Sequence, residues 1–363
     1  MRILPSHPRK IVSFAAMLTE ISPRLALYPS ESVARRAQRL ENCGPIVITT
    51  HPNPDGDAMG SSLALWRVLK KMGKTATVVV PNAYDQYLSW LDGSSEVVDA
   101  STKQADAIAL FAAADLIFCL DYNALRRVGE LEAMIRNSSA EFVLIDHHLD
   151  PEDFAHYNFH VAGLSSTAEL VYRLLLQLGT AHLIDKAVAE NIYVGLMTDT
   201  GSFRFSTTTP EVHLIAADLL QAGIDVGHIH NLIYDNFGEK RTRFLGFMLY
   251  KKLKVLPEYN TAYMAVSRAE GARFDLGPGD TEGLVNYCLS LKGINFGVLL
   301  KASDRGTKLS FRSIGKFPCN EFASHFGGGG HYNASGGKVD LNIEATEEKF
   351  LQLLEQYKDA LNY

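Results

Sequence analysis

Residues 46–57 read IVITTHPNPDGD, and this run joins an apolar strand pattern to a polar turn. The first five residues are apolar or β-branched, which is typical of a strand buried on both faces of a sheet. The turn that follows carries His51, Asp55 and Asp57 among Pro, Asn and Gly. In open α/β sheets, ligands bind just beyond the carboxyl ends of the strands. The run therefore predicts a buried strand that ends at a binding site.

The same alternation continues through the first half of the chain. Three further apolar runs resemble the first, and amphipathic stretches bounded by Ser, Pro or Gly lie between and after them. This alternation predicts an α/β fold with a doubly wound, mainly parallel sheet. The expected strands are 46–50, 75–80, 116–120 and 142–145, and the expected helices are 60–72, 167–178, 185–197 and 210–222.

The 363 residues are enough for two domains, each with a core of its own. We expect a catalytic domain over 31–225, a helical linker over 226–255 and a smaller α/β domain over 256–363. Residues 1–30 form an N-terminal extension to which we assign no role. In the smaller domain the expected strands are 261–267, 296–302 and 308–313, with helices near 281–291, 319–325 and from 345 onward.

The composition restricts the partners. The chain has 35 Lys and Arg against 41 Asp and Glu, which argues against a protein that coats long nucleic acids. The four cysteines form no CxxC pair, so we expect a reducing, cytoplasmic location. An apolar run at 11–18 is short and lacks a cleavage pattern, so no secretory signal is expected. No run reaches the ~20 apolar residues of a membrane span.

Acidic residues and imidazoles also follow the later strands. Asp121 follows the third strand, Asp146-His147-His148 follows the fourth, and Asp199 ends a helix. A single Asp at such a place is usually a helix cap or turn residue, and we read Asp146 as that or as a partner that orients an imidazole. Convergence from several strand ends is instead typical of a metal site. The predicted ligands are His51, Asp55, Asp57, Asp121, His147 and Asp199.

Two metal ions suit this donor set better than one. Imidazole and carboxylate donors without thiolates favour Mn²⁺, with Mg²⁺ or Co²⁺ as alternatives. Six side chains exceed what one ion takes from a protein while leaving room for water. Two ions roughly 3.5–4 Å apart are typical of phosphoryl hydrolysis. The sequence therefore predicts a two-metal phosphoesterase that needs no protein nucleophile.

These motifs closely resemble the DHH phosphoesterase superfamily. HPNPDGDAMGS at 51–61 matches its first motif, Asp121 the second, the tripeptide at 146–148 the third and DTG at 199–201 the fourth. GGGHYNASG at 328–336 is similar to the signature of the DHHA1 substrate-binding domain. Within the superfamily, the length and layout look like the bacterial nanoRNase/pAp phosphatase group.

The resemblance implies roles for the site residues. It assigns Asp57, Asp121, His147 and Asp199 to one ion, and His51, Asp55, Asp121 and Asp199 to the other. Asp121 and Asp199 are then shared by the two ions. The resemblance also implies that His148 faces the substrate phosphate, and these three residues are the predicted catalytic residues. The implied substrates are RNAs of a few nucleotides and 3′-phosphoadenosine 5′-phosphate (pAp), with a homodimer as an oligomeric state to test.

Candidate substrate contacts lie outside the metal site. Gly328, Gly329 and Gly330 are expected to form a loop whose N–H groups approach a phosphate, because no Cβ intervenes. His331 adds a polar donor to that loop. Arg312, on the preceding strand, is a candidate for bidentate phosphate binding, and Arg204 is a weaker one. A surface ion pair is the competing interpretation for Arg312.

Several alternatives stay open. The main substrate could be the linear dinucleotide pApA from cyclic-dinucleotide turnover. A RecJ-like single-strand exonuclease is disfavoured by the absence of an additional nucleic-acid domain and by the acidic composition, which predicts no stable complex with long nucleic acid. Polyphosphate hydrolysis is disfavoured by the glycine-rich ending. A catalytically inactive nucleotide sensor would have lost ligands, and all six are present.

Overall fold

The computed structural model describes residues 25–277 and 279–362. It divides into two compact units, the first ending at Ile233 and the second beginning at Tyr234. This division falls inside the stretch 226–255 that we expected to link two domains. The apolar run 11–18 and most of the expected N-terminal extension lie outside the described residues. The first described helix is α2, Ser30–Glu41.

The first unit is built on a six-stranded sheet with the order β3-β2-β1-β4-β5-β6, in which every pairing is parallel. The predicted fold class is thereby confirmed. The edge strands β3 and β6 were not predicted, because they are short and only partly buried and so lack a continuous apolar run. The strands are β1 Ile46–Thr49, β2 Ala76–Val80, β3 Val98–Asp99, β4 Leu116–Leu120, β5 Glu141–Asp146 and β6 Tyr157–His160.

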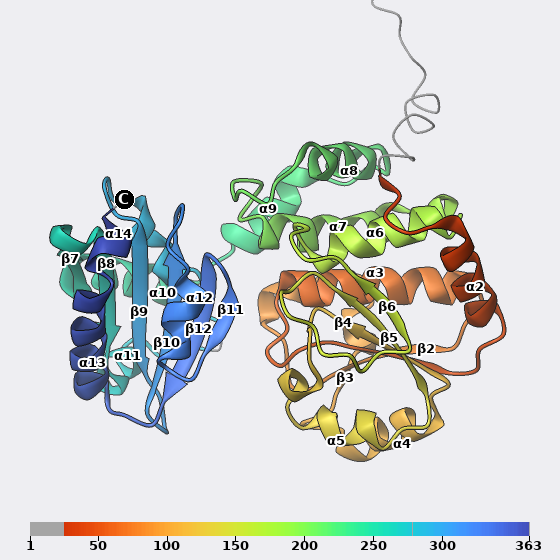
Figure 1. The fold of residues 1–363 in the computed structure, drawn as a ribbon, viewed down its shortest axis with the longest axis horizontal. Coiled ribbons are helices and arrows are strands. Elements are labelled where there is room, and N and C mark those ends of the chain that lie inside the picture. The colour runs from red at the N-terminus through yellow and green to blue at the C-terminus, as the bar shows by residue number, and fades with distance from the viewer. Residues whose placement is uncertain (1–24, 278, 363) are drawn as a thin grey trace, which may run out of the picture. The chain divides into compact units, whose positions relative to one another are not determined.

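Helices cover both faces of this sheet. In Figure 1, α3, α6 and α7 lie over one face and α4 and α5 over the other. The layered arrangement buries the continuous apolar runs of β1 and β4 on both sides. The helices are α3 Gly56–Lys71, α4 Gln104–Ala113, α5 Leu131–Arg136, α6 Thr167–Gln177, α7 Lys186–Asp199, α8 Pro210–Gln221 and α9 Val226–Tyr234.

Helix α3 begins at Gly56, four residues earlier than expected. The side chain of Asp55 caps it, because its Oδ1 accepts the N–H groups of Asp57 (3.0 Å) and Ala58 (3.1 Å). Asp57 therefore lies in the first turn of a helix, where its direction is fixed by the backbone. The expected start at residue 60 rested on the apolar pattern and overlooked this cap.

Glycines bring α3 and α7 unusually close together. A Cβ on Gly60 would lie 2.4 Å from the carbonyl oxygen of Asn191. A Cβ on Gly195 would lie 2.4 Å from Cβ of Ala168 and 2.8 Å from Oδ1 of Asp57. Since a real side chain cannot occupy either place, these two glycines permit the close contact of α3 with α7.

The second unit contains a mixed sheet with the order β11-β12-β10-β9-β8-β7. Only β8 and β9 pair in parallel among its described pairings. The smaller α/β domain is thus confirmed in class. Its elements are α10 Glu239–Phe247, β7 Leu253–Leu256, β8 Thr261–Val266, α11 Arg268–Ala272, β9 Phe296–Ala302, β10 Thr307–Ser313, α12 Cys319–Ser324, β11 Gly329–His331, β12 Ala334–Val339, α13 Ile343–Gln356 and α14 Lys358–Leu361.

Each face of this second sheet has its own core. Tyr263 and Val298 belong to a core with α12 and α13, whereas Met264 and Leu299 belong to one with α10. The alternation follows from the two-residue period of a strand. The helix expected near 281–291 is a 3-10 helix over Leu284–Ser290.

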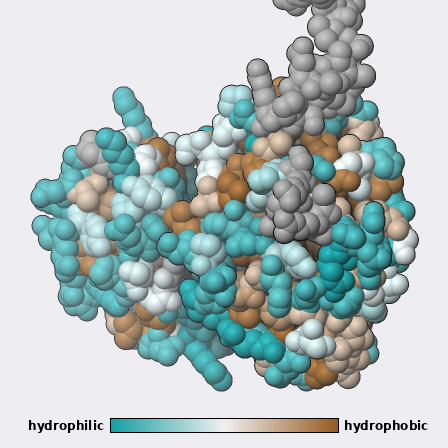
Figure 2. All heavy atoms as spheres, turned by 45° about the vertical axis from the view of Figure 1, so that its right-hand side comes forward, coloured by the Kyte–Doolittle hydropathy of each residue, from teal (hydrophilic) through white to brown (hydrophobic). Residues whose placement is uncertain are grey.

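The large apolar residues are mostly in these cores. Figure 2 shows a face of the molecule on which hydrophilic residues predominate and apolar ones occur in small groups. Among the described residues, no helix has both the length and the apolar character that crossing a bilayer requires.

Candidate metal centre

The candidate site lies where the strand order of the first sheet reverses. β1 and β4 are neighbours in space, and the strands that follow each of them lie on opposite sides. His51 comes two residues after the end of β1, and Asp121 comes directly after β4. Such a reversal opens a crevice at the carboxyl ends of the strands, which is where α/β folds bind ligands.

Asp121 is the centre of the cluster and is almost fully buried. Its backbone has a φ of +62°, a left-handed conformation that a non-glycine residue rarely adopts. Its Oδ2 lies 3.4 Å from Nε2 of His51, and its Oδ1 lies 3.6 Å from Nε2 of His147. One carboxylate therefore presents its two oxygens to two different imidazoles.

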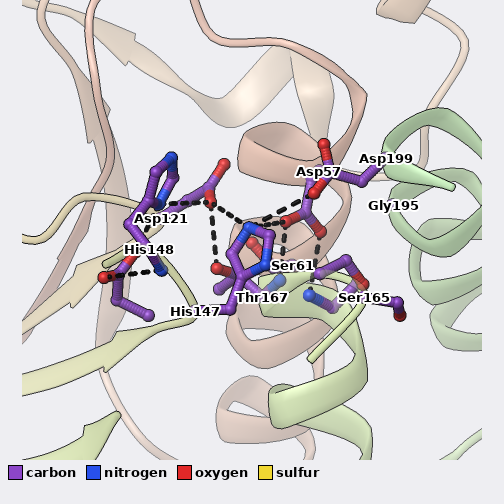
Figure 3. Close-up of polar contacts among 12 residues, drawn as sticks. Asp57, Ser61, Asp121, His147, His148, Ser165, Thr167, Gly195 and Asp199 are labelled. Carbon is purple, nitrogen blue, oxygen red and sulfur yellow. Dashed lines mark hydrogen bonds and ion pairs between the residues drawn. The ribbon is translucent and has the colours of Figure 1, made fainter. Parts of the chain in front are cut away.

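His147 lies between Asp121 and a second pair of carboxylates, as Figure 3 shows. Its Nε2 is 3.2 Å from Oδ2 of Asp199 and 4.0 Å from Oδ2 of Asp57. Its Nδ1 lies 3.0 Å from the carbonyl oxygen of Leu164. Because a carbonyl oxygen can only accept, Nδ1 carries the proton and Nε2 faces the carboxylates. A metal-binding histidine is commonly oriented in this way.

His51 and Asp55 lie on the other side of Asp121. Nε2 of His51 is 4.0 Å from Oδ1 of Asp55, and its Nδ1 is 3.0 Å from the carbonyl oxygen of Pro52. The side chain of Asp55 is 54 % exposed, in contrast to the buried Asp57. Among the groups whose ligand atoms lie within 4.8 Å of one another, two consist entirely of predicted metal ligands, and Asp121 belongs to both: His51, Asp55 and Asp121, and Asp57, Asp121 and His147.

His148 is oriented by Asp146, its neighbour in the 146–148 tripeptide. Its Nδ1 is 2.7 Å from Oδ1 of the fully buried Asp146, and its N–H donates to Oδ2 of the same residue at 3.2 Å. His160 lies behind the pair, with Nε2 2.5 Å from the carbonyl oxygen of His148. Asp146 therefore acts as the imidazole-orienting partner that the sequence allowed.

The acidic cluster carries a surplus of negative charge, which the pKa values record. Burial and the neighbouring charges of Asp121 and Asp199 raise the pKa of Asp57, although the N–H groups of Thr167 and Ala168 bond its oxygens. Burial raises the pKa of Asp199 to about 7; the charge of His147 opposes this rise, and the charges of Asp121 and Asp55 add to it. Carboxylates this crowded are stabilised by cations, and the imidazole–carboxylate donor set fits divalent ions of the Mn²⁺ type.

The pKa values of the two histidines are raised as well, because the surrounding carboxylates stabilise their charged forms. Burial lowers the pKa of His51, but the hydrogen bond with Asp121 and the charges of Asp55 and Asp121 outweigh it and raise that pKa to about 9. The pKa of His147 is raised in the same way by Asp121 and Asp199, against burial. Burial raises the pKa of Asp121, yet its contacts with His147 and His51 bring that pKa well below its usual range.

The glycine-rich segment of the second unit is partly a strand. Gly329 and Gly330 belong to β11, so the expectation of a loop is wrong for these two residues. Gly328 and Gly330 are needed for close backbone packing, because a Cβ on Gly328 would lie 1.9 Å from the carbonyl oxygen of Gly336 and one on Gly330 would lie 2.7 Å from that of Ala334. A Cβ on Gly329 would meet no atom within 4 Å. Composition alone could not distinguish a flexible loop from a tightly packed hairpin.

Arg312 and His331 share one face of the second sheet. Both residues pair with Ala334 on β12, which lies between their strands: Arg312 is on β10 and His331 on β11. Directly paired residues of antiparallel strands point to the same side. The two predicted phosphate contacts are therefore brought together within this unit.

Arg204 is engaged in its own turn. Its Nε donates to the carbonyl oxygen of Gly201 at 2.7 Å. Gly201, Ser202 and Phe203 all have positive φ, so the chain reverses tightly directly after Asp199. Arg204 remains a prediction as a substrate contact.

Sequence reasoning missed one contributor to the site. The hydroxyl of Thr167 donates to Oδ1 of Asp121 at 3.0 Å, and its N–H donates to Oδ2 of Asp57 at 2.6 Å. The sequence indicated only that a helix begins here, after two serines. The contact depends on how α6 meets β4 and α3, and no local pattern records that.

A parallel sheet of this order with a histidine–aspartate cluster at its reversal is the arrangement expected of a metal-dependent phosphoesterase. Residues 45–196 match the family model described as DHH family, N-terminal domain, and residues 259–360 match the DHHA1 domain. The chain belongs to the DHH family, in its two-domain DHH–DHHA1 form. The resemblance drawn from the sequence motifs is confirmed.

Relatives extend over nearly the whole chain. A Thermus thermophilus protein named bifunctional oligoribonuclease and PAP phosphatase NrnA is 30% identical over 323 residues, 88% of this chain and 92% of that protein. A solved structure described as an exopolyphosphatase-related protein from Bacteroides fragilis is 40% identical, with a TM-score of 0.89, and covers 92% of this chain and 98% of that one. RecJ from Thermus thermophilus in complex with Mn²⁺ shares the fold, at 16% identity and a TM-score of 0.52, over 94% of this chain and 56% of that one.

Proposed function

We propose that this protein hydrolyses short oligoribonucleotides to mononucleotides and removes the 3′-phosphate of pAp. The observation that carries the proposal is the similarity, across both domains, to the Thermus thermophilus relative that is named for both activities. The intact His–Asp cluster supports an active enzyme over an inactive nucleotide sensor. We propose that the protein acts in the cytoplasm, because the four cysteines of the chain, all of which lie in its described part, are free thiols.

Two divalent ions, preferably Mn²⁺, are proposed as cofactors. Asp57, Asp121, His147 and Asp199 would hold one ion, and His51, Asp55, Asp121 and Asp199 the other. When bound, such a pair supplies an activated water and neutralises charge on the phosphoryl oxygens. The proximity of both oxygens of Asp121 to different histidines supports its role as the bridging ligand.

The remaining side chains act on the substrate. His148, oriented by Asp146, donates a hydrogen bond to the phosphoryl oxygens as negative charge develops. Arg312 and His331, in the same unit as the segment 328–330, bind a second phosphate. Arg204, in the first unit, is a separate candidate for a substrate contact. Such a site gains little from a long strand, because long-strand binding needs many neutralised phosphates and the chain carries a net charge of −6.

A substrate panel tests the proposal. Purified protein with Mn²⁺ is given 5′-labelled RNAs of about two to twenty nucleotides, matching DNA, pAp and pApA. We expect kcat/KM to be highest at about two to five nucleotides and pAp to be hydrolysed. Processive loss of the longest strand ahead of a dinucleotide would return the RecJ-like alternative to first place.

Polyphosphate is included in the panel as a second candidate substrate. The 40% identical Bacteroides fragilis structure is described as exopolyphosphatase-related, and this observation favours the test. Hydrolysis of polyphosphate in preference to every nucleotide would replace the oligoribonuclease proposal. Chromatography of the same preparation with light scattering tests the proposed homodimer.

A further inference from the structure

One segment, residues 164–168, is buried from Ser165 onward and contacts three of the proposed metal ligands. At its end, the N–H groups of Thr167 and Ala168 donate to the two oxygens of Asp57 at 2.6 and 2.8 Å. The Thr167 hydroxyl donates to Asp121 at 3.0 Å. Figure 3 shows Thr167 beside Asp121 and Asp57. The position of this segment therefore sets the direction of two carboxylates.

The start of the segment contacts the third ligand. The carbonyl oxygen of Leu164 accepts the Nδ1 proton of His147 at 3.0 Å. Ser165 is the next residue, and both its N–H (2.9 Å) and its hydroxyl (2.6 Å) donate to Oε2 of Glu169. Glu169 thus fixes the residue that lies between the contact to His147 and the contacts to Asp57.

Glu169 is itself held by a buried cation. Its Oε1 accepts Nε of Arg173 at 2.9 Å and a second guanidinium N–H at 2.5 Å. Glu169 is fully buried and Arg173 is 4 % exposed. A buried ion pair is a poor source of stability, because desolvation offsets its attraction and an apolar pair often serves as well. It does supply fixed hydrogen-bond geometry, and Arg173 cancels a charge that would otherwise add to the acidic cluster.

Helix capping does not account for the arrangement. Ser166 already caps α6, because its hydroxyl accepts the N–H of Glu169 at 3.1 Å. In a capping box, the glutamate would return to the N–H of the capping residue. Here the carboxylate bonds the preceding residue, Ser165, which belongs to the segment that contacts the cluster.

We propose that Glu169, held by Arg173, is a positioning residue for the metal centre and acts through Ser165 on Asp57, Asp121 and His147. This inference rests on the proposed function, since it assumes that these three residues bind metal. Loss of the Glu169 contact would leave the ligands present but let the segment shift. Metal affinity would then fall in a protein that is still folded.

The test compares four variants by Mn²⁺ titration calorimetry, thermal unfolding, and separate kcat and KM values. Glu169→Gln places an amide NH₂ against the donors of either Ser165 or Arg173, and we expect Mn²⁺ binding to weaken roughly 10- to 100-fold. Ser165→Ala removes one of the two donors to Glu169 and should also weaken Mn²⁺ binding, but by a smaller factor. The double variant Glu169→Gln/Arg173→Met lets the amide oxygen accept from Ser165 again, so it should recover affinity.

Arg39→Met is the matched control. Arg39 pairs with Asp115 at 2.9 Å and with Glu141 in the same unit, away from the segment. We expect it to lower the melting temperature without changing Mn²⁺ affinity. Mn²⁺ affinities within about twofold of wild type in folded Glu169→Gln and Ser165→Ala would overturn the inference. If Glu169→Gln does not fold, the Mn²⁺ affinities of Ser165→Ala and of the double variant decide whether the inference holds. Failure of the proposed function is distinct, because the wild-type protein itself would then bind no Mn²⁺ or cleave no phosphoester.

Discussion

Oδ2 of Asp121 lies 3.4 Å from Nε2 of His51. The other oxygen of the same carboxylate faces His147, so removal of this one side chain affects both halves of the cluster. The residue that links them sits at the end of β4 with a positive φ. A conformation of this kind costs about 1–3 kcal/mol and persists only when the surrounding structure requires it.

Asp121→Asn should abolish hydrolysis of every substrate together while the fold is kept. Asn tolerates the left-handed conformation that Asp121 adopts, whereas Ala would add strain. We expect kcat at saturating Mn²⁺ to fall below about a tenth of wild type for RNA and pAp alike, with little change in melting temperature. A variant that retains more activity than this on either substrate would argue against a shared ligand.

Mn²⁺ affinity should rise with pH between about 6 and 9. Asp199, with its pKa raised to about 7, and His51, with its pKa raised to about 9, must both lose their protons before they can bind a cation. At lower pH, protons therefore compete with the metal. Titration calorimetry in buffers of different ionisation enthalpy should show proton release on binding. Affinity that is constant across this range would contradict the prediction.

Gly195→Ala should weaken metal binding and stability together. The added Cβ would lie 2.8 Å from Oδ1 of Asp57 and would force α7 away from α3. Overpacking of this kind costs about 1–3 kcal/mol. Gly246→Ala, in α10, is the control, because its Cβ would meet no atom within 4 Å. That variant should be as stable as wild type or more so, and it should bind Mn²⁺ normally.

The strands with continuous apolar runs, and the residues that follow them, could be predicted from the sequence. The edge strands β3 and β6 could not, since they are short and half exposed. The start of α3 depends on the Asp55 cap. The sequence Pro54-Asp55-Gly56 is also typical of a simple turn, so the cap could not be recognised from it. Thr167 contacts residues more than forty positions away in the sequence. Glu169 contacts Ser165 and Arg173, which are near it in the sequence, but the role of these contacts depends on their burial beside the cluster. No local pattern reveals either role.

Arg312→Ala and His331→Ala should separate substrate binding from metal binding. Both residues flank Ala334 in the second unit, and the proposed ligands all belong to the first. We expect KM for a short RNA to rise by about tenfold or more, as is typical when a charged hydrogen-bond donor is lost. Metal content by elemental analysis should match wild type. Loss of ions from either variant would show that the division of roles is wrong.

Metal stoichiometry tests the two-metal centre most directly. Dialysed protein is titrated with Mn²⁺ while electron paramagnetic resonance follows free and bound ions, and the same titration is made on Asp121→Asn. The proposed centre predicts that the wild-type chain binds two Mn²⁺ ions with the spectrum of a magnetically coupled pair. The Asp121→Asn variant should bind fewer than two ions, and their spectrum should show no coupling. A single uncoupled ion in the wild-type protein, or two coupled ions in Asp121→Asn, would contradict it.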